Sequence, residues 1–119
     1  MAFAVQVEHV VGTGVDVELT ARRPDPRSAR FFLRADERPS ELSAAELLRL
    51  WTVKEALFKA TPDNAEIVLL DYRLADAGAA TGRAAGPGGE QLAYASALVP
   101  DGVLTVAVCL AGGPDDVAV

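Results

Sequence analysis

One long helical segment with a defined start and end constrains the fold more than any other feature of the sequence. It starts at Ser43-Ala44-Ala45-Glu46, which has capping-box spacing: the serine hydroxyl and the glutamate carboxylate each accept a hydrogen bond from a free backbone N–H. Pro62 ends the helix, because proline has no N–H to donate. At about 100° per residue, one apolar stripe runs along it, formed by Leu47, Leu50, Trp51 and Phe58. This stripe has to pack against another layer.

Two stretches ahead of the helix have the period-two alternation of β-strands. Apolar residues alternate with others from Phe3 to Val11 and again from Val15 to Leu19, which is typical of half-buried strands. Gly12-Thr13-Gly14 lies between them and indicates a turn, so we expect a hairpin. Prolines on both sides limit Ser28 to Phe32 to a short helix or turn.

Three further strands are expected after the helix. A strand-like run from Ile67 to Leu74 precedes a glycine- and alanine-rich loop from Ala75 to Gly89. The apolar runs Leu92 to Val99 and Val103 to Leu110 follow, joined by a hairpin turn at Pro100-Asp101-Gly102. This order of elements indicates an α+β fold in which an antiparallel sheet packs against a long helix.

The size and composition predict a single domain. A length of 119 residues suits one domain, which we place at 1–111, with 112–119 as a flexible C-terminal tail. The single cysteine, Cys109, cannot form an internal disulfide, which favours a reducing compartment. No apolar run approaches the roughly 20 residues of a membrane span, and Met1-Ala2-Phe3-Ala4 lacks the basic region of a signal peptide. We therefore expect a cytoplasmic protein without a membrane partner.

The charges are unevenly distributed along the chain. The net charge of −6 argues against nucleic acid as a partner, because the long-range field repels phosphate polymers. Basic residues nevertheless gather in a short stretch, 22–38; they are Arg22, Arg23, Arg27, Arg30, Arg34 and Arg38. This basic stretch is either a solvated surface or a dock for a phosphorylated ligand or an acidic partner.

Two acidic residues lie side by side on a predicted strand. Asp16 and Glu18 are two positions apart, so both carboxylates leave the same face of the strand, with Cα atoms about 6.6 Å apart. One hard cation can bridge such a pair, and oxygen ligands suit Mg²⁺ or Mn²⁺. The alternative is that the pair simply forms the solvent face of an edge strand.

The helix carries a second unusual set of charges. Lys54 falls inside the apolar stripe, and Glu55 lies at its margin, one turn before Lys59. A lysine whose stem packs on apolar surface and an ordinary Glu55–Lys59 surface pair would explain these positions without any chemistry. Together with Asp16 and Glu18, however, they describe a site for a metal-bound polyphosphate, in which acids hold the cation and lysines neutralise phosphate charge. The lone histidine, His9, lies away from the acidic pair and is left out of this site.

These residues carry a resemblance to a known family. The segment Gly14-Val15-Asp16-Val17-Glu18, followed by Trp51-Thr52-Val53-Lys54-Glu55-Ala56-Leu57-Phe58-Lys59, resembles the paired signature of the 4′-phosphopantetheinyl transferase superfamily. The match includes Arg30-Phe31-Phe32, Asp36 where the family often has an acidic residue, and the closing strand Val103 to Leu110. The resemblance implies a phosphopantetheinyl transferase-like α+β fold.

The implied activity is transfer of the phosphopantetheine arm from coenzyme A to a serine of an acyl or peptidyl carrier protein, with release of 3′,5′-ADP. Such holo-acyl-carrier-protein synthase activity serves fatty acid, polyketide and nonribosomal peptide biosynthesis. The resemblance assigns Asp16, Glu18 and Glu55 to Mg²⁺, or to Mn²⁺, together with the coenzyme A pyrophosphate. Glu55 or a metal-bound water would deprotonate the carrier serine.

The resemblance also assigns the basic side chains. Lys54 and Lys59 would act in catalysis by neutralising the phosphates of coenzyme A, with Lys54 favoured for assisting the leaving 3′,5′-ADP. Arg30 would join them in binding coenzyme A. The basic stretch 22–38 would dock an acidic carrier protein or the 3′-phosphate.

Two types within the superfamily share features with this chain. The motifs look like the second half of the larger surfactin-synthetase-activating type, whereas the length matches the small holo-acyl-carrier-protein synthase type, a homotrimer with active sites between subunits. We therefore expect a homo-oligomer, a trimer ahead of a dimer. The alternative is a non-catalytic relative or an excised domain that binds carrier proteins or a synthase complex.

Overall fold

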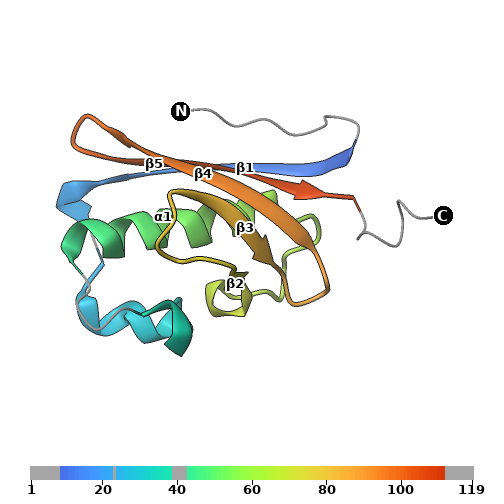
Figure 1. The fold of residues 1–119 in the computed structure, drawn as a ribbon, viewed down its shortest axis with the longest axis horizontal. Helices are drawn as coiled ribbons and strands as arrows, with labels where there is room; N and C mark the ends of the chain where they lie inside the picture. Colours follow the sequence, from blue (N-terminus) through green and yellow to red (C-terminus); the bar gives the residue numbers. More distant parts are fainter. Residues whose placement is uncertain (1–8, 23, 39–42, 112–119) are drawn as a thin grey trace.

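The computed structural model describes residues 9–22, 24–38 and 43–111, which form a sheet with one long helix across one face (Figure 1). The elements are β1 (Val10–Leu19), α1 (Ala44–Ala60), β2 (Arg73–Leu74), β3 (Thr81–Ala85), β4 (Gln91–Val99) and β5 (Gly102–Leu110). The five strands are arranged in the order β1-β5-β4-β3-β2, and each neighbouring pair is antiparallel. The predicted α+β fold is confirmed. No helix among these residues could span a membrane.

Helix α1 begins and ends where the sequence predicts. The Ser43 hydroxyl accepts a hydrogen bond from the Glu46 N–H at 3.1 Å, and the helix ends at Ala60, with Pro62 two residues further on. The second half of the predicted capping box is wrong, because the Glu46 carboxylate accepts hydrogen bonds from the Arg49 guanidinium instead, one of them at 2.9 Å. Arg49 also donates to the backbone carbonyls of Ala77 and Ala79, so it ties the loop before β3 to the helix.

The hairpin predicted around Gly12-Thr13-Gly14 is wrong. These residues continue a single strand, β1, which pairs with β5 and has one irregularity between Val10 and Gly12. Gly12 and Gly14 face α1, where an added Cβ would overlap the backbone carbonyl oxygens of Ala60 and Ala56. The glycines therefore let a strand backbone lie directly against a helix backbone. The earlier part of the expected first strand, 3–8, lies outside the described residues.

The segment between α1 and β4 also differs from the prediction. Of the run from Ile67 to Leu74, Leu69–Asp71 forms a 3₁₀ turn and only Arg73–Leu74 is a strand, β2. The expected loop from Ala75 to Gly89 contains β3. The sequence of β3, Thr-Gly-Arg-Ala-Ala, has few residues that favour a strand by themselves, so its pairing with β4 decides its conformation.

Two other local predictions are confirmed. The β4–β5 hairpin turns at Pro100 and Asp101, and Asp101 has a φ of 62°. The short helix expected at Ser28 to Phe32 is a 3₁₀ helix, Pro26–Phe31, in which Asp25 Oδ1 accepts a hydrogen bond from the Arg27 N–H at 2.8 Å. The predicted tail, 112–119, lies outside the described residues.

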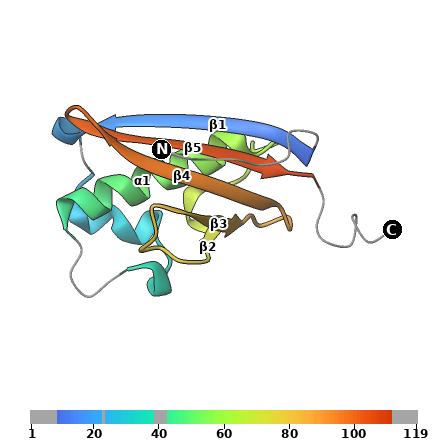
Figure 2. The same ribbon diagram turned by 45° about the horizontal axis from the view of Figure 1, so that its top comes forward.

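The core lies between α1, the sheet and the short 3₁₀ segments, which Figure 2 shows beside the helix. Leu47 and Leu50 of the predicted stripe are fully buried, whereas Trp51 and Phe58 are partly buried and pack against the margin of the core. Further buried helix residues come from outside that stripe: Val53, Ala56, Leu57 and Ala60. The helix is covered on more than one side, because the segments around Phe32 and Tyr72 pack against it as well as the sheet.

The contact between the strand and the helix predicts the effect of adding one methyl group. Gly14→Ala should lower the free energy of unfolding by about 1–3 kcal/mol, because the overlap with Ala56 forces the two backbones apart. Gly78→Ala is the matched control, since the nearest atom to its Cβ would lie at 3.4 Å, an ordinary contact. Urea unfolding of both variants tests this. Equal stability of Gly14→Ala and the parent protein would contradict the close packing.

Candidate active site

Asp16 and Lys59 form the most closely bonded part of the candidate site. Asp16 lies on the helix face of β1 and is 5% exposed. Its Oδ1 accepts a hydrogen bond from Lys59 Nζ at 2.8 Å, and Lys59 also donates to the Val15 carbonyl at 3.3 Å. Asp16 Oδ2 is buried without a hydrogen-bond partner. A buried carboxylate oxygen without a partner is costly, so this atom is suited to accept a ligand.

Glu18 lies two positions along the same face of β1 and is half-buried. Its Oε1 accepts a hydrogen bond from the Trp51 indole Nε1 at 3.3 Å. The structure therefore places both carboxylates on one face of β1, as the spacing predicts, and this face is turned toward α1 rather than toward open solvent. The alternative of a simple solvent face does not describe Asp16.

Glu55 completes the acidic group from the side of the helix. Burial raises the pKa of its carboxyl, and the negative charges of Asp16 and Glu18 raise it further, while Lys59 opposes them. Lys59 itself has a raised pKa, chiefly because of its hydrogen bond to Asp16. The lysine is thus bonded to the strand, in place of the Glu55–Lys59 pair considered from the sequence, and still acts electrostatically on Glu55.

Lys54 lies apart from this group. It is 0% exposed, and its ammonium donates to Glu37 Oε1 at 2.8 Å and to the Tyr72 carbonyl. Burial lowers the pKa of Lys54, and Glu37 partly offsets that effect. The other bonds of Glu37 are to the backbone N–H groups of Arg34, at 2.8 Å, and Leu74, at 2.7 Å. This buried pair fastens the 3₁₀ turn Ala35–Glu37 and strand β2 to the helix.

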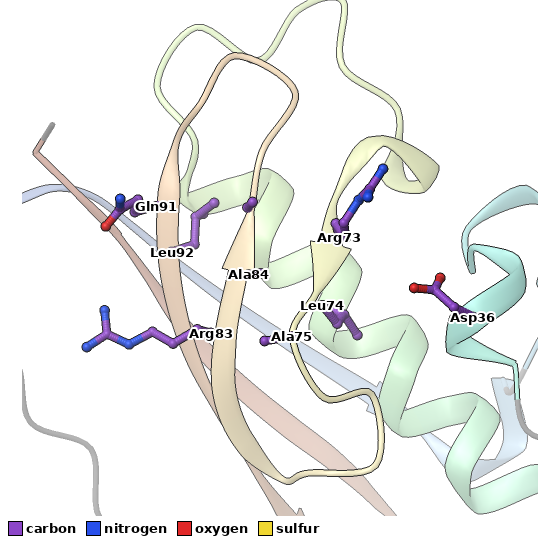
Figure 3. A pocket seen from close by; sticks show the side chains of 9 residues that line it. Asp36, Arg73, Leu74, Ala75, Arg83, Ala84, Gln91 and Leu92 are labelled. Carbon is purple, nitrogen blue, oxygen red and sulfur yellow. The ribbon is translucent and has the colours of Figure 1, made fainter. Parts of the chain in front are cut away.

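Glu37 is not among the residues that the sequence predicts for the site. Its neighbour Asp36 is the residue that the sequence comparison with the family favours, and this position next to Asp36 is the one feature that could have pointed to Glu37. Asp36 is exposed and lines a different pocket of about 640 Å³, together with Arg73 of β2 and Arg83 of β3. Figure 3 shows Asp36 on one side of this pocket and the strands that carry the two arginines on the other. The structure does not bring Asp36 together with Asp16.

An apolar groove of about 520 Å³ adjoins Glu55. Its lining comes from the 3₁₀ helix Pro26–Phe31, from α1 and from the segment before β2: Ser28, Phe31, Phe32, Trp51, Glu55, Phe58, Ile67, Val68 and Leu69. Phe31 and Val68 at its margin are 65% and 57% exposed. The Arg30 guanidinium lies 4.8 Å from the centre of the Phe31 ring. A ligand with an apolar surface and some negative charge would suit this groove.

The basic stretch divides into exposed and structural residues. Arg22, Arg27, Arg30 and Arg38 are exposed, and Arg27 lies 3.5 Å from the exposed Asp25. Arg34 is half-buried and donates to the Leu70 carbonyl at 3.2 Å. Position 23 lies outside the described residues. Most of the arginines that the structure describes here are therefore available to a partner.

The outer face of β1 is apolar. Val11, Val15, Val17 and Leu19 point away from α1, and each is about half exposed, from 48% to 53%. Their partners across the β1–β5 pairing include Val106 and Leu104. An apolar strip of this kind is typical of a surface that contacts another protein.

Within 9–22, 24–38 and 43–111, no three His, Cys, Asp or Glu side chains are arranged as a metal-binding cluster. The contacts explain this arrangement: Asp16 is bonded to Lys59, and Glu18 to Trp51. The unpartnered oxygen of Asp16 and the purely oxygen donor set nevertheless fit a hard divalent cation.

Comparison with known protein families shows what the chain is similar to. The family described as the 4′-phosphopantetheinyl transferase superfamily matches residues 12–95, more than half of the chain. The matched region runs from within β1 through α1 to the middle of β4, and therefore includes every residue of the acidic group. A search of curated proteins gives no significant match.

The buried Lys54–Glu37 pair predicts a large loss of stability on removal of one partner. Lys54→Met should lower the free energy of unfolding by about 3–5 kcal/mol, because it leaves the Glu37 carboxylate buried without its counter-charge. The double variant Lys54→Met/Glu37→Gln should recover part of this loss, since the charge is then gone. Chemical denaturation of the two variants makes the comparison. A single variant as stable as the parent protein would contradict this structural role.

Proposed function

The chain belongs to the 4′-phosphopantetheinyl transferase superfamily, and on that premise we propose that it transfers the arm of coenzyme A to a serine of an acyl or peptidyl carrier protein. The observation that carries the proposal is the grouping of Asp16, Glu18 and Glu55 with Lys59 between β1 and α1. In the reaction, the serine oxygen attacks the phosphorus that bears the pantetheine arm. The bond from that phosphorus to the bridging oxygen breaks, and 3′,5′-ADP leaves with the electron pair.

Glu55 is the proposed general base. Its half-buried carboxylate lines the groove, so one side of it is open to an entering hydroxyl. A serine hydroxyl that enters from the groove would pass its proton to this carboxylate. The groove is therefore the proposed route of the acceptor serine.

Lys59 is the proposed phosphate ligand. Its side chain is 48% exposed while its ammonium reaches the buried Asp16, so it can contact a pyrophosphate without leaving the site. Arg30, which is exposed at the edge of the groove, is the proposed additional contact to coenzyme A. Lys54 is fully buried and bonded to Glu37, and this favours a structural role over contact with a phosphate.

Asp16, Glu18 and Glu55 are the proposed ligands of a divalent cation, Mg²⁺ or Mn²⁺. A cation of this kind neutralises pyrophosphate charge and stabilises the leaving group. Asp16 would offer its unpartnered Oδ2, and Lys59 would balance the remaining negative charge.

The proposed partners follow from two surfaces. An acidic carrier protein suits the exposed arginines of the basic stretch next to the groove. The apolar outer face of β1 supports self-association, and we propose a homo-oligomer, a trimer ahead of a dimer, in which neighbouring subunits share the coenzyme A site. The cytoplasm, which contains coenzyme A, is the proposed compartment.

A second candidate is a domain that binds carrier proteins without transferring anything. One arrangement favours it: the acidic side chains are bonded to Lys59 and Trp51 rather than clustered around a cation position. A substitution at Glu55 distinguishes a transferase from a domain that only binds carrier proteins. A binding domain would keep its affinity for a carrier in Glu55→Gln and would show no transfer in the parent protein.

The transfer itself is tested by the intact mass of an apo carrier protein after incubation with coenzyme A, Mg²⁺ and this protein. We expect a mass gain of one phosphopantetheine, lost on chelation of the metal. Glu55→Gln should slow it by about 10²–10⁴-fold, the usual contribution of a general base. Glu66→Gln is the matched control, because it removes the same charge at an exposed position. No gain with any of several carriers, from folded protein, would reject the transferase.

A further inference from the structure

Trp51 lies between the two parts of the candidate site. Its indole N–H is bonded to Glu18 Oε1 at 3.3 Å, and its ring forms part of the wall of the groove beside Glu55. Phe32, which is 1% exposed, meets the indole edge-on, with ring centroids 5.0 Å apart and planes at 84°. This contact limits rotation of the indole, so its N–H stays directed at β1.

Glu18 needs such a contact because of its neighbours. Asp16 lies on the same face of β1 and Glu55 lies on the facing helix, and both are also acidic, so their negative charges repel the Glu18 carboxylate. Lys59 bonds to Asp16, and among the described side chains the hydrogen bond to Glu18 comes from Trp51. Without a donor at this position, repulsion favours rotamers that turn the half-buried Glu18 toward solvent.

We propose that Trp51 is a positioning residue that holds the Glu18 carboxylate in place for a divalent cation. The inference rests on the proposed function. It adds to it a residue that acts through the proposed metal ligand Glu18 and does not contact the substrate. Hydrogen-bond donors behind metal ligands typically change metal affinity by 10–100-fold. Because this bond is long at 3.3 Å, we expect the lower end of that range.

The experiment measures Mn²⁺ binding to the full chain by electron paramagnetic resonance of the free ion, with and without coenzyme A. Trp51→Phe keeps an aromatic ring and removes the N–H, and it should weaken Mn²⁺ binding about 10-fold. In a Glu18→Gln background, the same substitution should have less than a 3-fold effect, because the ligand that it positions is already changed. Leu98→Ala, a substitution at a position of β4 that is 84% exposed, should bind Mn²⁺ like the parent protein.

Each outcome decides a separate point. Unchanged Mn²⁺ affinity in folded Trp51→Phe, or an equal loss in the Glu18→Gln background, would overturn the positioning role while leaving the proposed function intact. Absence of Mn²⁺ binding by the parent protein would reject the proposed cation site and this inference with it. If Trp51→Phe does not fold, the tryptophan is replaced by 3-benzothienylalanine, which has the same shape but no N–H. The same 10-fold loss is then expected, and unchanged affinity would overturn the proposal.

Discussion

The close approach of strand β1 to helix α1 is the constraint on which the rest of the structure depends. Gly12 and Gly14 allow it, because any Cβ at these positions would overlap helix carbonyl oxygens. Two residues further along the same face, Asp16 lies close enough to the helix for its carboxylate to reach Lys59. A wider separation would leave the acids of the strand and Glu55 of the helix as independent surface charges. The backbone contact thus brings the acids of β1 near Glu55, whose pKa is raised by burial and then by the negative charges of Asp16 and Glu18.

Lys54 and Lys59 of the helix have different surroundings, and this difference explains their different proposed roles. Lys54 is enclosed, and its partner Glu37 also accepts two backbone N–H groups, so this pair holds three segments of the fold together. Lys59 is half exposed and bonded to an aspartate that keeps one oxygen without a partner. An exposed ammonium can exchange partners when a phosphate arrives, whereas a buried one would leave an uncompensated charge behind.

Much of the fold and the acidic part of the site could be predicted from the sequence, because helix caps, period-two alternation and residue spacing are local signals. Ser43 and Pro62 bound the helix, and the alternation at Asp16 and Glu18 places both on one face. The glycines of β1 suggested a turn, since their role depends on a helix more than 40 positions away. Two features could not be predicted in this way: the burial of Lys54, and its pairing with Glu37 rather than with Asp36. Both depend on how the 3₁₀ turn Ala35–Glu37 packs against the helix, which residue spacing does not encode.

The central claim is that three carboxylates converge between β1 and α1, and the titration of Glu55 tests it most directly. Carbon-13 NMR of the side-chain carboxyl follows the pKa of Glu55 in the parent protein and in Asp16→Asn. The account predicts a pKa above the usual value for glutamate in the parent protein. It predicts a lower pKa in Asp16→Asn, because the variant removes a repelling charge and frees Lys59 to act on Glu55. An ordinary pKa that does not respond to Asp16→Asn would contradict the convergence of these side chains.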